Sequence, residues 1–215
     1  MVRTTSKLAL GSANFGLNYG IKNNSGKISH EELENILSEA DLSGIQIIDT
    51  AQAYGDSESR IGSLCSEGRF EVVTKIGLDI EKAYPNYNVD RLVKTSCKRL
   101  NQSRLYAVML HRPEVLLGDY GSMIITELQI LKERNVVSKV GVSIYSPEIL
   151  KEISKLLQLD IVQVPFNIFD QQIMSSGWSD RLKDNGIEIH TRSAFLQGLL
   201  LMNQSSLPKF FYRNW

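Results

Sequence analysis

Residues 47 to 62 read IIDTAQAYGDSESRIG, which passes from an apolar run into a helical pattern within a few positions. The apolar start has the composition of a short strand that is buried on both faces. Asp49 lies where this strand would end, and Tyr54 and Gly55 follow in the connection. A buried strand that ends in polar groups and continues into a helix is the repeating unit of a parallel α/β fold.

Short apolar runs rich in β-branched residues recur along the chain, with starts about 30 residues apart. They are KLALGSA (7–13), IQIIDTA (45–51), FEVVTKIG (70–77), LYAVMLH (105–111), SKVGVSI (138–144), DIVQVPF (160–166) and IEIHTRSA (187–194). Most are apolar almost throughout, as strands in the middle of a layered fold are. We therefore predict seven strands.

Segments with helical spacing lie between these runs. SHEELENILSEADLSG begins with Ser29 and has Glu32 three residues later, which is the pattern of a capping box, and Gly44 ends the segment. A further helix is expected to begin near Ser57, and NVDRLVKTSCKRLN, GSMIITELQILKERN and SPEILKEISKLLQ have the same spacing. Strands that alternate with helices predict a parallel sheet with right-handed crossovers.

Two architectures satisfy this alternation, an open doubly wound sheet and a closed (β/α) barrel. No G-x-G-x-x-G sequence follows a strand and opens a helix. The glycine-rich segment at 11–20 does not match a phosphate-binding loop, and no helix is expected to begin there. We therefore predict an α/β protein with a parallel (β/α) TIM barrel, with seven of the eight β/α units present and residues 1–215 forming a single domain.

The composition points to small-molecule chemistry. Lysine and arginine together number 24, as do aspartate and glutamate, so no excess charge favours nucleic acid or an anionic membrane. The start has no secretory signal, and no apolar run is long enough to span a bilayer. Cys65 and Cys97 fit buried free thiols and match no metal site. We expect a cytoplasmic protein with neither a nucleic-acid nor a membrane partner.

In a (β/α) barrel the chemistry lies where the strands end. The polar residues expected there are Asp49, Tyr54, Lys75, His111, Ser143, Gln163, Asn167, Arg192 and Ser193. Each has an ordinary explanation by itself: a lysine reaches solvent, a histidine is satisfied within the structure, and a tyrosine packs in its loop. Together, ionisable groups on three successive strand ends are costly to bury unless they are paired.

Asp49 beside Lys75 would provide that pairing. The ammonium would then favour the phenolate of Tyr54 and lower its pKa from about 10 toward neutrality. Such a phenol is a usable general acid, and His111 could donate to the oxygen that Tyr54 protonates. This set suits carbonyl reduction, in which a hydride reaches carbon and a proton reaches oxygen.

The segments IIDTAQAYGDSESRIG, VVTKIG, VMLHRP, KVGVSIYS, IVQVPFN and IHTRSAFLQGLLL follow one another over nearly the whole chain. Together they resemble the aldo/keto reductase superfamily, and most of all its bacterial branch encoded beside sugar and surface-polysaccharide genes. The resemblance implies a (β/α)8 barrel that uses NADP(H), with NAD(H) as the alternative, and no metal. It implies Tyr54 as proton donor, Asp49 and Lys75 as its tuning pair, and His111 as the group that orients the substrate.

The resemblance also assigns cofactor contacts. Ser143 and Gln163 match positions that hold the nicotinamide carboxamide, and Ser193 matches one near the pyrophosphate. Arg192 falls where many members stack an aromatic ring on the nicotinamide, and a guanidinium can stack on a ring as well. Ile144 stands where many members have asparagine, which removes one amide contact.

The resemblance further implies an eighth strand and a C-terminal tail that holds the adenosine end of the cofactor. Seven strands would leave two sheet edges without a partner and an exposed apolar seam. We therefore expect the chain to lack the eighth strand and the tail, and its open edge to allow self-association.

Three functions follow from these residues. The first is an NAD(P)H-dependent oxidoreductase that reduces an aldehyde, ketone or sugar carbonyl, with Tyr54 as general acid. The alternative is a truncated, non-catalytic aldo/keto reductase-like protein that binds a partner or senses dinucleotide. The third is an aldolase or isomerase that uses Lys75 as a Schiff base, which a charged, paired lysine disfavours.

Overall fold

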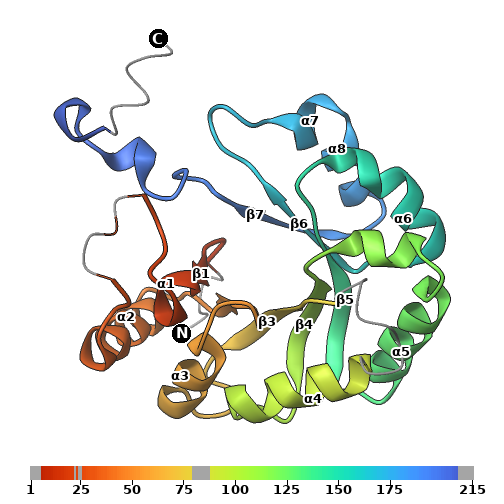
Figure 1. The fold of residues 1–215 in the computed structure, drawn as a ribbon, viewed down its shortest axis with the longest axis horizontal. Coiled ribbons are helices and arrows are strands. Elements are labelled where there is room, and N and C mark those ends of the chain that lie inside the picture. Colours follow the sequence, from red (N-terminus) through yellow and green to blue (C-terminus); the bar gives the residue numbers. More distant parts are fainter. Residues whose placement is uncertain (1–5, 22, 24–25, 79–87, 208–215) are drawn as a thin grey trace.

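The structure is a computed structural model that describes residues 6–21, 23, 26–78 and 88–207. It contains a parallel sheet in which the strands are hydrogen-bonded in chain order, β1 to β7. The strands are β1 (Ala9–Gly11), β2 (Ile47–Asp49), β3 (Glu71–Ile76), β4 (Leu105–Leu110), β5 (Val137–Ser143), β6 (Ile161–Pro165) and β7 (Glu188–Arg192). The predicted seven strands and their parallel arrangement are confirmed. The sheet curls into a half-barrel, which decides against the open doubly wound alternative (Figure 1).

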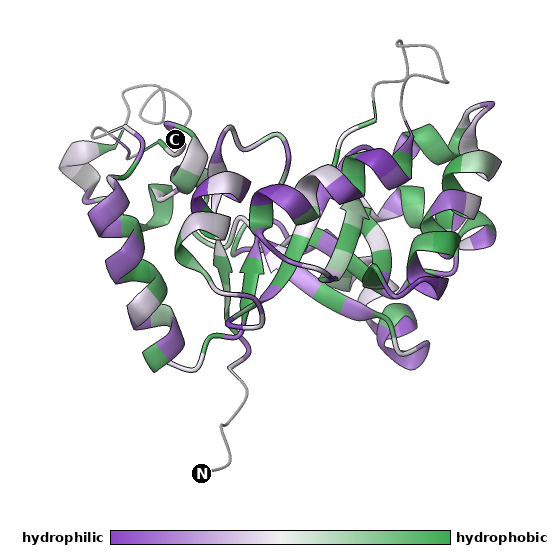
Figure 2. Cartoon of the chain, turned by 90° about the horizontal axis from the view of Figure 1, so that it is seen from below, coloured by the Kyte–Doolittle hydropathy of each residue, from purple (hydrophilic) through white to green (hydrophobic). Residues whose placement is uncertain are grey.

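Helices cover the outer face of the curled sheet (Figure 1). They are α1 (Ala13–Gly16), α2 (His30–Leu42), α3 (Ser57–Leu64), α4 (Val89–Leu100), α5 (Gly121–Glu133), α6 (Leu150–Leu156), α7 (Gln172–Ser175) and α8 (Trp178–Asp184). Short 3-10 turns lie at Pro113–Leu117, Pro147–Ile149, Leu199–Leu201 and Gln204–Ser206. Figure 2 shows largely apolar strands and helices with mixed hydrophilic and hydrophobic faces. Within the described ranges, no helix has the length and apolarity needed to cross a membrane.

The helix ends follow the local sequence. The Ser29 hydroxyl accepts a hydrogen bond from the Glu32 amide at 3.1 Å, as the predicted capping box requires. At α4, the Asn88 side chain caps the first turn, and the Glu127 carboxylate from α5 accepts a hydrogen bond from the Val89 amide at 2.6 Å. These contacts satisfy backbone donors that the first turn of a helix leaves open.

The glycine-rich segment at 11–20 differs from the sequence prediction, because α1 begins there at Ala13. The helix has only four residues, which is too short for a periodic pattern to show in the sequence. Its Phe15 side chain is buried, and the Arg60 guanidinium from α3 donates to the carbonyl oxygens of Phe15 and Ile28. Arg60 therefore fixes the connection after β1 against the helix that follows β2.

The strands separate two apolar clusters. The larger cluster lies between sheet and helices, and Ile48, Val108 and Val162 belong to it. The smaller one fills the barrel interior with Val73, Ala107, Met109 and Ile161. Successive residues along a strand point alternately toward the helices and toward the barrel interior. Both sides are apolar, which explains the continuous apolar runs in the sequence. Cys65 and Cys97 are buried free thiols, as predicted.

β1 and β7 form the two edges of the sheet, and no described strand pairs with both to close the ring. The segment after β7 crosses the gap instead, and the Ile21 amide donates to the Gln197 carbonyl oxygen at 3.1 Å. Figure 1 shows this segment leaving β7 and approaching the connection after β1. Ser193, Leu196 and Gln197 adopt positive φ angles of 61°, 47° and 58°, so this crossing is made of tight turns.

The contact between α3 and α4 gives a test of the packing. An added Cβ at Gly62 would lie 2.2 Å from the Arg99 carbonyl oxygen. Glycine to alanine in an open helix stabilises by about 1 kcal/mol, but overpacking of this kind costs about 1–3 kcal/mol. We expect Gly62→Ala to lower the urea midpoint of unfolding, whereas Ser63→Ala on the exposed side of the same helix should leave it nearly unchanged. A higher midpoint for Gly62→Ala would contradict this packing.

Candidate active site

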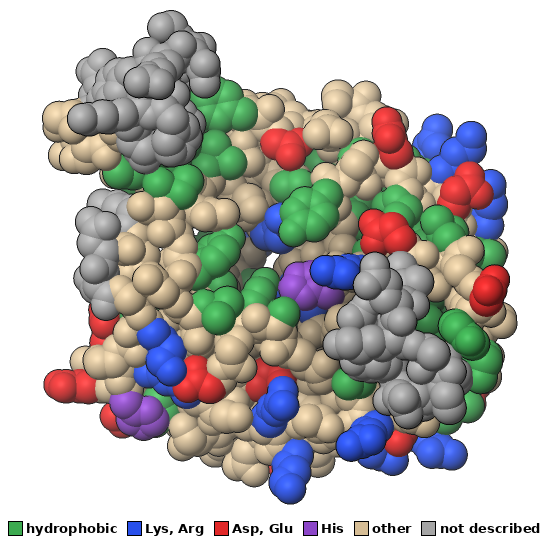
Figure 3. Space-filling view, in the orientation of Figure 1, with side chains coloured by type: hydrophobic (Ala, Val, Ile, Leu, Met, Phe, Trp, Pro, Cys, Tyr) green, Lys and Arg blue, Asp and Glu red, His purple; other side chains and the backbone are tan. Residues whose placement is uncertain are grey.

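A cavity of about 410 Å³ opens at the carboxyl ends of the strands. The space-filling view shows this face hollowed near its centre, with histidine and basic side chains at the rim (Figure 3). The described residues that line the cavity are Gly11, Ser12, Ala13, Asn14, Tyr19, Asp49, Tyr54, His111, Ser143, Tyr145, Gln163, Arg192, Ser193, Ala194, Phe195, Gln197 and Gly198. Seven of the nine polar residues predicted at the strand ends therefore border one cavity, and Lys75 lies directly behind it against Asp49.

The ion pair between Lys75 and Asp49 forms the floor of this site. The Lys75 Nζ lies 2.6 Å from Asp49 Oδ2 and donates to the Thr50 carbonyl oxygen at 3.0 Å. The Lys75 side chain is 1% exposed, which makes it one of the largest fully buried side chains. Burial lowers the pKa of the Lys75 ammonium, and the Asp49 carboxylate opposes that shift.

A chain of hydrogen bonds continues from this ion pair across the barrel. The Gln163 Nε2 donates to Asp49 Oδ1 at 2.8 Å, and the Ser143 hydroxyl contacts Gln163 Oε1 at 3.1 Å. Ser143 and Gln163 are both buried. Three strand ends, those of β2, β5 and β6, are therefore tied together by side chains.

Tyr54 lies over this floor. Its ring centroid is 5.3 Å from Lys75 Nζ and 6.1 Å from the His111 ring, which meets it edge-on at 84°. Gly55 has a φ of 59°, as expected for the glycine that turns the loop, and an added Cβ at Gly16 would lie 1.8 Å from the Tyr54 carbonyl oxygen. Gly16 and Gly55 thus let the connections after β1 and β2 pack closely, which sets the position of Tyr54.

The pKa of Tyr54 differs from the sequence prediction. Burial of the phenol raises its pKa above the ordinary value, and the Asp49 carboxylate adds to the rise, while Arg192 opposes it. The predicted lowering by Lys75 is wrong for the unliganded site, because Asp49 neutralises the ammonium and desolvation then dominates. Tyr54 is therefore held as a protonated phenol, which is a hydrogen-bond donor.

His111 follows β4 and is half-buried beside Tyr54. Burial lowers the pKa of its imidazole, and the charges of Lys75 and Arg192 lower it further. The neutral form is favoured, and a neutral imidazole still carries one N–H donor. Two uncharged donors, a phenol and an imidazole, therefore meet at one wall of the cavity.

Arg192 is the last residue of β7 and lines the same cavity. Its Nη2 donates to the Ile144 carbonyl oxygen at 3.1 Å, and its Nη1 donates to the Ser193 hydroxyl at 3.3 Å. The guanidinium carbon lies 4.4 Å from the centroid of the Tyr145 ring. The Ile144 side chain is buried, so this residue offers its backbone oxygen, rather than a side-chain amide, to the site.

Several lining residues were not predicted from the sequence, among them Asn14, Tyr19, Tyr145 and Gln197. They come from loops, where no periodic pattern marks them. Asn167 was a candidate but does not line the cavity; its side-chain oxygen accepts hydrogen bonds from backbone amides of its own loop. Its polarity is explained by that turn.

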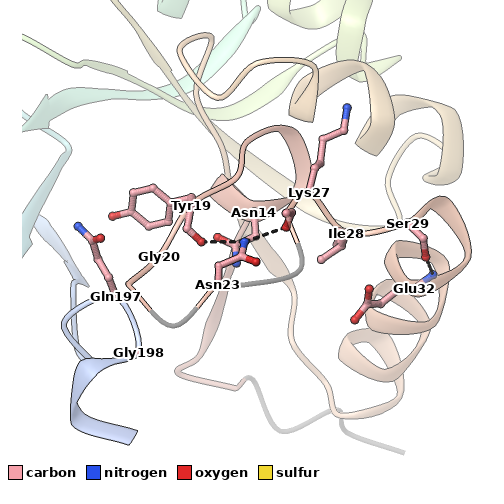
Figure 4. Close-up of a pocket in the computed structure, with 11 residues that line it drawn as sticks. Asn14, Tyr19, Gly20, Asn23, Lys27, Ile28, Ser29, Glu32, Gln197 and Gly198 are labelled. Carbon is pink, nitrogen blue, oxygen red and sulfur yellow. Dashed lines mark hydrogen bonds between the residues drawn. The ribbon is translucent and has the colours of Figure 1, made fainter. Parts of the chain in front are cut away.

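A second cavity of about 670 Å³ adjoins the first. The two share Asn14, Tyr19, Gln197 and Gly198. Asn23 shapes its wall by donating to the carbonyl oxygens of Tyr19 and Gly26 at 3.1 and 2.8 Å (Figure 4). The combined space runs from Tyr54 to the first turn of α2, where Ser29 and Glu32 line it. In the described part of the chain, no group of three or more His, Cys, Asp or Glu side chains could hold a metal ion.

Comparison with known proteins identifies relatives. The sequence profile of the aldo/keto reductase family matches residues 7–215. An uncharacterised oxidoreductase, YqkF of Bacillus subtilis, is 27% identical over 181 residues, which are 77% of this chain. The match covers 56% of YqkF, so the chain spans about half the length of this relative.

Solved structures share the fold. The glycerol dehydrogenase AKR11B4 from Gluconobacter oxydans is 25% identical, with a TM-score of 0.71 over 96% of this chain and 66% of that one. The aldo/keto reductase from Klebsiella pneumoniae in complex with NADP and acetate is 18% identical, with a TM-score of 0.69 over 93% of this chain and 68% of that one.

Asp49→Asn tests the ion pair. Removing one partner of a buried pair leaves an uncompensated charge, which costs about 3–5 kcal/mol. We expect Asp49→Asn to lower the free energy of unfolding in urea by this amount, and the double variant Asp49→Asn/Lys75→Met to recover much of the loss. Asp56→Asn is the matched control, because its pair with Lys27 is exposed. Equal stability of Asp49→Asn and wild type would contradict the burial of this charge.

His111→Gln tests the lowered pKa. The unfolded chain binds a proton near pH 6.5 whereas folded His111 binds it only at lower pH, so stability falls as pH drops through about 6.5. We expect His111→Gln to flatten the dependence of the unfolding free energy on pH between about 7 and 5. His30→Gln, on the surface at the start of α2, controls for the loss of one histidine. A slope equal to that of wild type would count against the shift.

Proposed function

The chain belongs to the aldo/keto reductase family, and we propose that it is an oxidoreductase that uses NADP(H), or NAD(H), to reduce an aldehyde, ketone or sugar carbonyl. The observation that carries this proposal is the meeting of Tyr54 and His111 above the Asp49–Lys75 pair in one cavity. Two uncharged donors at one wall suit a carbonyl oxygen, on which negative charge develops during reduction.

The proton comes from Tyr54 in this proposal. The substrate carbonyl oxygen accepts hydrogen bonds from the Tyr54 hydroxyl and the His111 N–H, and the phenolic proton passes to it as the C–H bond forms. Lys75 then lies close enough to stabilise the phenolate that remains, while Asp49 holds the ammonium in place. The reduced nicotinamide supplies the hydride when it is bound.

The residues present fit a nicotinamide ring. Ser143 and Gln163 are a hydroxyl and an amide in the wall of the cavity, and their mutual hydrogen bond can be exchanged for bonds to a carboxamide. Arg192 offers a planar guanidinium and Ser193 a hydroxyl beside it. We therefore assign these four residues to cofactor binding. The Klebsiella pneumoniae relative that holds NADP supports NADP(H) as the first choice.

A second candidate function is a non-catalytic protein that binds a partner or senses dinucleotide. The edges of β1 and β7, which no described strand joins, favour this candidate. A stable oligomer without turnover would support it. A Schiff-base enzyme is disfavoured, because the 2.6 Å contact with Asp49 keeps Lys75 charged. We also propose that residues 1–215 form a single barrel domain and that the protein is located in the cytoplasm.

Tyr54→Phe tests the proposal. With the general acid removed, NADPH-dependent reduction of an activated aromatic aldehyde should fall by about 10²–10⁴-fold, measured as loss of absorbance of the reduced cofactor. Tyr106→Phe is the matched control, since Tyr106 donates to Glu188 at the other end of the barrel and should retain activity. Equal rates for wild type and Tyr54→Phe would refute the proposed role, and no turnover by wild type would favour the non-catalytic alternative.

A further inference from the structure

Arg192 carries a positive charge that no carboxylate neutralises within the part of the chain that the structure describes. Its hydrogen bonds go to a backbone carbonyl oxygen and to a serine hydroxyl, and its flat face lies on the Tyr145 ring. These contacts hold the guanidinium in one orientation, but none of them neutralises its positive charge. A guanidinium has five N–H donors, so several remain for a ligand.

The charges at the cavity do not cancel. The Asp49 carboxylate forms an ion pair with the Lys75 ammonium at 2.6 Å, and this pair has no net charge. His111 favours its neutral form because burial and the nearby cations lower its pKa. Arg192 therefore gives the site a net positive charge, and Arg112 adds a further cation near His111.

The two states of a nicotinamide cofactor differ in charge at one ring. The oxidised ring is a pyridinium cation and the reduced dihydropyridine is neutral, while the phosphates and the adenosine are the same in both. If the ring is to deliver a hydride to a carbonyl held by Tyr54, it must lie in the cavity of about 410 Å³ that Arg192 lines. A fixed positive charge in that wall repels the oxidised ring and not the reduced one.

We propose that Arg192 makes the site select the reduced form of the cofactor over the oxidised form. This inference rests on the proposed function, because it needs a nicotinamide in the cavity. Tyr145 and the Ile144 carbonyl oxygen act as positioning groups, since they hold the guanidinium in the wall. The selectivity favours reduction, because oxidised cofactor formed in the cavity is bound less tightly and leaves more readily.

The test is the ratio of two dissociation constants, that of NADP⁺ divided by that of NADPH, measured by calorimetric titration of the 215-residue chain. Contacts to the phosphates and the adenosine cancel in this ratio, so it reports the nicotinamide ring alone. We expect Arg192→Gln to lower the ratio about tenfold, and the NAD⁺/NADH pair to show the same change. Arg192→Lys should keep the ratio near that of wild type, because it keeps the charge.

Arg181→Gln is the matched control. Arg181 also lies over an aromatic ring, that of Trp178 at 5.3 Å, but it is on the exposed surface of α8. The ratio should stay unchanged in this variant. An unchanged ratio in Arg192→Gln, or an equal fall in Arg192→Lys or Arg181→Gln, would overturn the inference while leaving the proposed function standing. If the ratios changed as expected but the chain reduced no aldehyde, the proposed function would be overturned and the inference about Arg192 would stand. If neither form bound wild type at millimolar concentration, both would fall.

Discussion

A buried lysine sets the conditions for the rest of this site. Lys75 is almost completely removed from water, and a buried ammonium is tolerated only with a well-placed partner. Asp49 provides it from the neighbouring strand, and the backbone oxygen of Thr50 completes the coordination. The pair then orders its surroundings, because the second carboxylate oxygen of Asp49 accepts the Gln163 amide. Tyr54, His111 and the cavity are arranged around this one interaction.

Much of the fold could be predicted from the sequence because the signals were strong and repeated. Seven apolar runs of strand length, separated by capped helices, leave few parallel arrangements. The convergence of Asp49, Lys75 and His111 followed from the rule that parallel strands end at one face. The prediction needed no knowledge of side-chain positions, because it required only which strand each residue ends.

The parts that could not be predicted depend on loops and on competing energies. α1 is a single turn, and the contact of Tyr145 with Arg192 joins the loop after β5 to the end of β7, which is distant in sequence. The predicted direction of the Tyr54 pKa shift was wrong, because the sequence shows neighbouring charges but not how deeply the phenol is buried. Once Asp49 neutralises Lys75, desolvation of the phenol is the larger effect.

The hydrogen bond from Gln163 to Asp49 joins residues that are 114 positions apart. Contacts between such distant segments form slowly, because the chain must lose the freedom of a long loop before the bond is made. During synthesis, the Asp49 carboxylate therefore gains this hydrogen bond only after β6 has left the ribosome. The pocket is therefore complete only when β2 and β6 lie in the same curled sheet, and a small molecule that binds this assembled pocket would stabilise the folded sheet against unfolding.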